Sequence, residues 1–229
     1  MKSEFEKYAM GHKGISSLKL FDYNAAMVNR PMMMTPNIIE ERQKNAVSMD
    51  VFSRLMADRI IFLGLPIDSM VANSVNAQLL FLESVDNEKD ISMYLNTPGG
   101  EIYGGLAIYD LMQYVSTDIL TVTTGIAASM GSILLCAGTK GKRSALKHSR
   151  IMIHQPRSGM EGTMSDMAIS LAEGIKLKKE LYEIISLCSG QSLEKVEKDS
   201  DRDYWMTAEE AKEYGLIDNV LGARKTKRQ

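Results

Sequence analysis

Residues 119–139 of the chain read ILTVTTGIAASMGSILLCAGT. This stretch holds 21 consecutive residues without a charged side chain, a length that can span a bilayer. Six hydroxyl-bearing side chains and three glycines run through it, and such a composition is unfavourable in a lipid-facing helix. The stretch instead predicts a buried, β-branched strand at 119–124, a tight turn, and a buried helix at 129–137.

Strands and helices alternate around this stretch. Hydrophobic runs at residues 59–64 and 91–95 predict two more strands. Apolar spacing predicts a helix after each of them, marked by Val71, Val75, Leu79 and Leu82 and by Leu106, Tyr109, Met112 and Gln113. Strands joined by such helices predict right-handed crossovers and a parallel sheet, and therefore the α/β fold class.

The two ends of the chain differ from this pattern. Residues 1 to about 45 show little periodicity and predict an arm. The C-terminal third is more helical, and TAEE at 207–210 is a capping box that opens a short helix. A long amphipathic helix is predicted from Met167, Leu171, Ile175, Tyr182 and Ile185. The basic residues at 224–228 indicate a solvated tail.

Composition excludes several functional classes. Lys and Arg number 27 against 29 Asp and Glu, and a net charge of −2 does not suit a general nucleic-acid binder. Two cysteines and three histidines give neither a disulfide framework nor metal-ligand spacing, and residues 138–142 lack the glycine spacing of a phosphate loop. The N-terminal segment lacks the apolar core of a secretory signal, so we expect a cytoplasmic protein without a membrane span or a cofactor.

Ser129 is a candidate nucleophile because it lies where the predicted strand gives way to a helix. Unpaired N–H groups and the positive end of the helix dipole favour an oxyanion there. The spacing is not G-x-S-x-G, since residue 127 is alanine. Taken alone, the stretch favours the simpler interpretation that Ser129 caps the helix.

A serine nucleophile needs a general base and an acid that orients the base. His12 lies in the arm and His148 in a polar stretch that we expect to be exposed. His154 ends an apolar run shortly before Pro156. This position is equally compatible with a functional histidine and with a buried structural one. Three acids remain open: Asp199, Asp201 and Asp203.

The residues TPGG at 97–100 follow a predicted strand. They indicate a turn in which glycine supplies a positive φ. Their other interpretation is a backbone N–H that points into a cleft at the carboxyl ends of parallel strands.

Taken together, the motifs resemble the family of Clp protease proteolytic subunits, ClpP. The resemblance runs in order from about residue 36 to 221. It rests on FSRL at 52–55, IIFL at 60–63, NTPGG at 96–100, AASMG at 127–131, KGKR at 140–143, MIHQP at 152–156, GQSLE at 190–194, DRD at 201–203 and EYGLID at 213–218.

The resemblance implies roles for particular residues. Ser129 would be the nucleophile, His154 the general base and Asp203 the acid of a Ser-His-Asp triad. The backbone N–H groups of Gly100 and Met130 would form the oxyanion hole.

The resemblance also implies an architecture. The fold would be crotonase-like, with stacked β–α–β units and a protruding helix-and-strand handle at about residues 155–188. Residues 1–35 would be an N-terminal extension that self-processing removes as a propeptide, residues 36–221 the protease domain, and residues 222–229 a basic C-terminal tail.

The implied activity is that of a serine endopeptidase in ATP-dependent proteolysis. The subunit would form a homo-oligomer of two stacked heptameric rings around a closed chamber and cleave short peptides unaided. Unfolded protein substrates would come from a hexameric AAA+ unfoldase, which uses ATP and Mg while this chain needs no cofactor or metal. Ser92 departs from the family, where an aromatic residue often lies beside the equivalent of Tyr94 in the pocket that receives the unfoldase.

Three other interpretations compete. A crotonase-type acyl-CoA enzyme shares the fold but does not need the Ser129, His154 and Asp203 set. A Ser-Lys peptidase would use Lys140 or Lys142 as its base. An inactive ring scaffold is disfavoured because all three triad residues are present.

Overall fold

The computed structural model describes residues 37–42, 45–157, 159 and 162–222. It divides into two compact units, residues 1–53 and residues 54–229, which are described separately. His12, the predicted extension at 1–35 and most of the predicted tail lie outside the described residues.

The described part of the first unit is a hairpin. Strand β1 (Asn37–Arg42) pairs antiparallel with β2 (Asn45–Asp50). Helix α3 (Val51–Ala57) follows at once, because the Asp50 carboxylate caps it by accepting hydrogen bonds from the N–H groups of Phe52 and Ser53. The arm predicted for residues 1 to about 45 therefore contains regular strand pairing in its described part.

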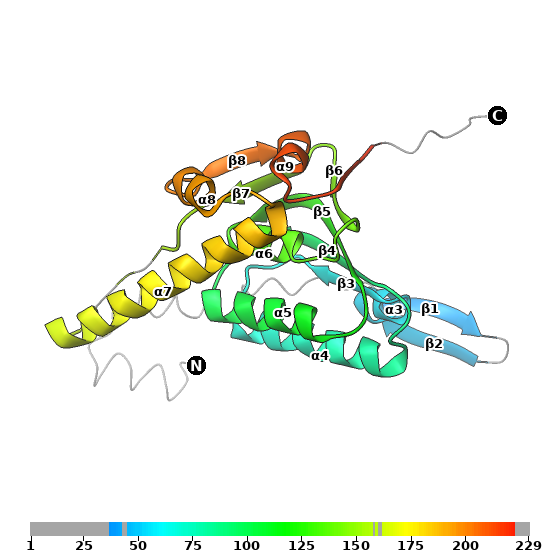
Figure 1. The fold of residues 1–229 in the computed structure, drawn as a ribbon. Helices are drawn as coiled ribbons and strands as arrows, with labels where there is room; N and C mark the ends of the chain where they lie inside the picture. Colours follow the sequence, from blue (N-terminus) through cyan, green and yellow to red (C-terminus); the bar gives the residue numbers. More distant parts are fainter. Residues whose placement is uncertain (1–36, 43–44, 158, 160–161, 223–229) are drawn as a thin grey trace, which may run out of the picture. The chain divides into compact units, whose positions relative to one another are not determined.

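The second unit is built on a mostly parallel sheet, as Figure 1 shows. The parallel order is β3-β4-β5-β6-β9, β7 pairs parallel with β5, and β8 pairs antiparallel with β7. Their bounds are β3 (Ile60–Leu63), β4 (Ile91–Thr97), β5 (Ile119–Ala128), β6 (Arg143–Leu146), β7 (Arg150–Ile153), β8 (Tyr204–Thr207) and β9 (Asn219–Leu221). The α/β class predicted from the sequence is confirmed.

Strand β5 is the branch point of the sheet. Its residues 121–123 pair with β6, and its residues 126–128 pair with β7. The sequence predicted an end at residue 124, which is wrong, because Gly125 leaves room for the Asn96 side chain and the strand continues. A Cβ on Gly125 would lie 2.5 Å from Asn96 Oδ1, which accepts a hydrogen bond from the Ile126 N–H.

Helices connect the parallel strands, as the crossover prediction requires. Those of the second unit are α4 (Ser69–Val85), α5 (Ile102–Tyr114), α6 (Met130–Cys136), α7 (Met164–Ser189), α8 (Leu193–Asp199) and α9 (Ala208–Tyr214). Helices α4 and α5 pack side by side, and α7 extends away from the sheet (Figure 1). The capping box predicted at residues 207–210 is confirmed at the start of α9.

Two burial predictions fail within this chain. The amphipathic helix is present as α7, but Leu171 and Ile175 on its predicted inner face are exposed, while Tyr182 and Ile185 near its C-terminal end are buried. The aromatic residues that follow Asp203 would also be expected in the core, yet Tyr204 and Trp205 are exposed, whereas Met206 beside them is buried. Both errors arise because an apolar side chain predicts burial against another apolar surface, and that surface need not belong to the same chain.

A largely buried ion pair joins β6 to the segment before β9. Arg143 Nη2 lies 2.7 Å from Asp218 Oδ1, and the two side chains are only 5% and 18% exposed. Asp218 Oδ2 also accepts hydrogen bonds from the N–H groups of Gly141 and Arg143. Burial opposes ionisation of Asp218, but the Arg143 hydrogen bonds outweigh it and lower the pKa of this carboxyl below its ordinary value.

We expect Asp218→Asn to reduce the free energy of unfolding by about 3 kcal/mol, because the buried Arg143 loses its charged partner. Since the folded-state pKa of Asp218 is lowered, the wild-type contribution is present above the unfolded pKa and is lost as the pH falls through the folded pKa. Urea titrations at pH 7 and below pH 4 measure both effects. Asp118→Asn, which removes an exposed partner of Lys142, is the control and should cost much less stability than Asp218→Asn; equal losses would contradict the prediction.

Candidate active site

Ser129 occupies a sharp turn between β5 and α6, where its backbone has φ 56° and ψ −124°. Non-glycine residues rarely adopt such a positive φ, which costs about 1–3 kcal/mol. The Ser129 N–H donates to the Met152 carbonyl at 2.9 Å, and the Ser132 hydroxyl donates to the Ser129 carbonyl at 2.7 Å. Ser129 is the N-cap residue of α6, as the simpler interpretation requires, but its side chain makes no capping hydrogen bond to the helix.

Two glycines allow residues 97–100 to lie directly against this turn. A Cβ on Gly99 would come within 2.5 Å of the Ala128 carbonyl oxygen and 2.8 Å of the Ser129 Cβ. A Cβ on Gly131 would come within 2.8 Å of Thr97 Cγ2. The positive φ predicted for this turn is confirmed at Gly99, where φ is 89°.

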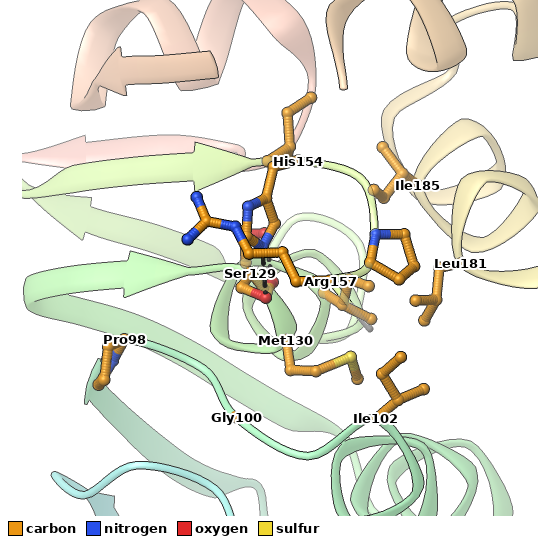
Figure 2. Close-up of a pocket in the computed structure, with 13 residues that line it drawn as sticks. Pro98, Gly100, Ile102, Ser129, Met130, His154, Arg157, Leu181 and Ile185 are labelled. Carbon is orange, nitrogen blue, oxygen red and sulfur yellow. Dashed lines mark hydrogen bonds between the residues drawn. The ribbon is translucent and has the colours of Figure 1, made fainter. Parts of the chain in front are cut away.

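His154 follows β7 and lies beside Ser129 (Figure 2). Its Nε2 is 2.9 Å from Ser129 Oγ, and its Nδ1 is 2.9 Å from Asp203 Oδ1. The imidazole is 12% exposed, whereas His148 lies exposed on the surface as the sequence predicted. The structure thus joins Ser129, His154 and Asp203 in one continuous hydrogen-bonded chain.

The other two candidate acids have different partners. Asp199 forms an ion pair with Lys195. The Asp201 carbonyl accepts a hydrogen bond from the Gln155 side-chain amide at 2.7 Å. The Gln155 backbone N–H donates to the Ser200 carbonyl at 2.5 Å. The residue after His154 is therefore tied to the loop that carries the acids, and this tie keeps the third of them within reach of the imidazole.

Asp203 has a second partner that the sequence did not reveal. Arg157 Nη2 lies 3.0 Å from Asp203 Oδ1 and 3.2 Å from Oδ2. The hydrogen bond from His154 lowers the pKa of Asp203 below its ordinary value, burial opposes this effect, and the Arg157 hydrogen bond and charge lower the pKa further. The sequence offered no signal for this contact beyond the position of Arg157 just after Pro156.

Gly100 and Met130, the predicted oxyanion-hole residues, line the same cavity as Ser129. Met130 is the first residue of α6, so no carbonyl lies one turn earlier in the helix to accept its hydrogen bond. Gly100 forms an isolated bridge with Ile67, but that bridge uses the Gly99 carbonyl and the Glu101 N–H. Neither N–H is consumed by these neighbouring elements.

A cavity of about 240 Å³ opens beside Ser129 and His154. Its wall is mainly apolar, as Figure 2 shows, and the side chains of Leu181 and Ile185 come from α7. The lining residues are Pro98, Gly100, Ile102, Ser129, Met130, Ser132, Ile133, Ile153, His154, Pro156, Arg157, Leu181 and Ile185. The cavity can hold an apolar side chain next to the Ser129 hydroxyl.

Neither of the two lysines considered as alternative bases lines the cavity that contains Ser129. Lys142 Nζ lies 2.6 Å from Asp90 Oδ2 and 2.8 Å from Asp118 Oδ2. Hydrogen bonds to these carboxylates raise the pKa of Lys142, which opposes a role as a base. Lys140 lines a different cavity, of about 360 Å³, that does not include Ser129.

Within the described residues, no group of three or more His, Cys, Asp and Glu side chains is placed to hold a metal ion. No helix in that same part of the chain is long and apolar enough to cross a membrane.

Comparisons with known proteins identify the family. A model of the Clp protease family matches residues 42–224. An ATP-dependent Clp protease proteolytic subunit of Porphyromonas gingivalis is 59% identical over 219 residues, which cover 96% of this chain and 97% of the relative. Proteins of the same name from Bacteroides fragilis and Bacteroides thetaiotaomicron are 58% and 56% identical over 218 residues, covering 95% of this chain and 98% of each relative. The chain therefore belongs to the Clp protease family and is a serine endopeptidase.

Proposed function

We propose that Ser129, His154 and Asp203 form the catalytic triad with which this chain hydrolyses peptide bonds. The observation that carries the proposal is the chain of two 2.9 Å contacts from Ser129 Oγ through the imidazole to Asp203 Oδ1. These three residues come from three separate segments, so their hydrogen-bonded meeting is difficult to explain by local sequence preferences alone. The strained backbone of Ser129 supports the same role, since such strain gathers at functional sites.

In the proposed reaction, Ser129 Oγ attacks the carbonyl carbon of the scissile bond while His154 Nε2 takes the hydroxyl proton. Asp203 accepts a hydrogen bond from Nδ1, which fixes the tautomer of His154 and stabilises the imidazolium. The imidazolium then protonates the leaving amine, and an acyl-enzyme remains. Water attacks this ester with His154 again acting as base, so Ser129 is regenerated and the new carboxyl group is released.

The N–H groups of Gly100 and Met130 form the oxyanion hole of this proposal. Both line the cavity beside Ser129, and their placement at a turn and a helix start is favourable for charge that develops only in the transition state. An apolar side chain of the substrate would fill the cavity and pack against the wall that α7 contributes.

The proposed assembly follows the relatives, whose names describe them as proteolytic subunits of ATP-dependent proteases. This chain would form two stacked heptameric rings and receive unfolded polypeptides in the cytoplasm from a hexameric AAA+ unfoldase. The unfoldase would use ATP and Mg, and the subunit itself would need no cofactor. Exposed apolar side chains along α7 support an assembly role for a handle at about residues 155–188, namely Met164, Ile169, Leu171 and Ile175.

We expect a fluorophosphonate probe to label the assembled protein on Ser129. Labelling should fall by at least about 1,000-fold in His154→Ala, because the hydroxyl loses its base. Lys142→Ala should label like the wild type, since the Lys142 ammonium forms ion pairs with Asp90 and Asp118 and not with Ser129. Gel fluorescence and peptide mapping measure both results, and loss of labelling in Lys142→Ala with retention in His154→Ala would favour a Ser-Lys peptidase.

Gly99→Ala should abolish peptide hydrolysis, because its Cβ would push against the Ala128 carbonyl and Ser129. Gly141→Ala is a matched control, since Gly141 has nearly the same φ, 88° against 89°, and open space around a Cβ. Both variants carry similar backbone strain, and only one displaces the nucleophile. Hydrolysis of a fluorogenic peptide by the assembled proteins tests this, and similar activities for the two variants would contradict it.

The extension at residues 1–35 is proposed to be a propeptide that the active site removes. A Ser129→Ala protein made without active subunits should therefore keep the segment up to about residue 33. Intact-mass spectrometry of wild type and variant provides the comparison. A trimmed Ser129→Ala protein would rule out self-processing while leaving the triad proposal intact.

A further inference from the structure

The Arg157 guanidinium forms an ion pair with Asp203, the acid of the proposed triad. One nitrogen, Nη2, lies within hydrogen-bond distance of both oxygens of Asp203, at 3.0 and 3.2 Å. The same arginine lines the cavity that contains Ser129 and His154, and Figure 2 shows it next to both. Arg157 is thus a fourth polar side chain in the site, and it contacts one member of the proposed triad.

The exposure of Asp203 explains why a second partner matters. Its side chain is 41% exposed, whereas the carboxylate of a triad is ordinarily buried and held by several donors. A carboxylate held only by the imidazole can rotate about its side-chain torsions and turn toward water. The contact from Arg157 to both oxygens restrains this rotation and leaves Oδ1 directed at His154 Nδ1.

Other charged side chains near this loop have different partners. Arg202 is adjacent to Asp203 in the sequence, but its Nη1 donates to the Asp201 carbonyl at 3.2 Å and its Nε lies 4.0 Å from Asp201 Oδ2. Asp199 is paired with Lys195. The ion pair on Asp203 therefore comes from the segment that follows β7, the strand that also leads to His154.

We propose that Arg157 is a positioning residue that holds the Asp203 carboxylate in the orientation required by His154. The inference rests on the proposed triad and adds a fourth side chain to it. Arg157 acts through Asp203 and makes no bond to the substrate in this role. The guanidinium suits the task better than an ammonium would, because it ends a longer side chain and holds Nη2 rigidly in the plane of the group while this nitrogen contacts both oxygens.

A different role would leave a different signature. The Arg157 side chain is 76% exposed and lines the cavity, so it could bind the substrate instead. A substrate contact would change KM and would persist when Asp203 is altered. A positioning role changes kcat and vanishes when Asp203 no longer orients the imidazole.

The experiment is a double-mutant cycle in the full-length assembled protein, with kcat and KM measured on a fluorogenic peptide. Because the ion pair is exposed, we expect Arg157→Ala to lower kcat by about five-fold with KM unchanged. Asp203→Asn should lower kcat by about 1,000-fold or more. Adding Arg157→Ala to Asp203→Asn should cause no further loss, since the two residues act as one unit.

Two further variants make the result specific. Arg157→Lys keeps the charge but has a shorter side chain and no rigid guanidinium, so it should recover only part of the loss in kcat. Arg150→Ala is the matched control, because this arginine lies on β7 and its guanidinium contacts only the His148 and Ser149 carbonyls among the hydrogen bonds described. Its kcat should equal that of the wild type, and size-exclusion chromatography confirms that every variant compared is assembled.

The outcomes separate this inference from the triad itself. The positioning role is overturned if Arg157→Ala has wild-type or higher kcat, or if only its KM changes. It is also overturned if Arg157→Ala lowers kcat equally in the wild type and in Asp203→Asn. If Asp203→Asn keeps wild-type kcat, the proposed triad fails as well. If Asp203→Asn is inactive and Arg157→Ala is unaffected, only the role of Arg157 fails.

Discussion

The successive pairing of β5 with two different strands is the constraint on which the site depends. The first part of β5 pairs with β6 and its last residues pair with β7, so the two neighbours leave the strand at different places. Ala128 is aligned with Met152, whose carbonyl accepts the Ser129 N–H. This register places Ser129 at the end of one strand and His154 just beyond the end of the next. The nucleophile and its base therefore meet because of backbone pairing, before any side chain contributes.

Close backbone approach completes the arrangement. The segment that follows β4 lies against the Ser129 turn, and only glycine fits at residue 99. The strained conformation of Ser129 is maintained by this packing and by the hydrogen bond to β7. Both belong to a well-buried region of the sheet, whose packing offsets the free-energy cost of the strain. Rigid placement of this kind is what hydrolysis by a preorganised site requires, since donors must already face the developing charge.

The sequence predicted the alternating elements, the crossovers and the turn at Ser129, because hydrophobic periodicity and glycine placement act locally. It could not choose among three aspartates, since their distances from His154 depend on the tie between Gln155 and the loop at 200–203. It missed the continuation of β5 beyond residue 124 because that depends on the Asn96 side chain across the sheet. It also missed the Arg157 contact, which joins residues 46 positions apart. The family resemblance supplied the choice of Asp203, which the hydrogen bonds support.

Trapping the acyl-enzyme tests whether Ser129 is the nucleophile. The assembled protein is mixed with an activated peptidyl ester, quenched in acid within milliseconds, and examined by intact-mass and peptide-mapping mass spectrometry. We expect a mass increase equal to the acyl group, located on Ser129 and absent after complete turnover. Acylation of any other residue, or rapid turnover without a trapped ester on Ser129, would contradict this expectation.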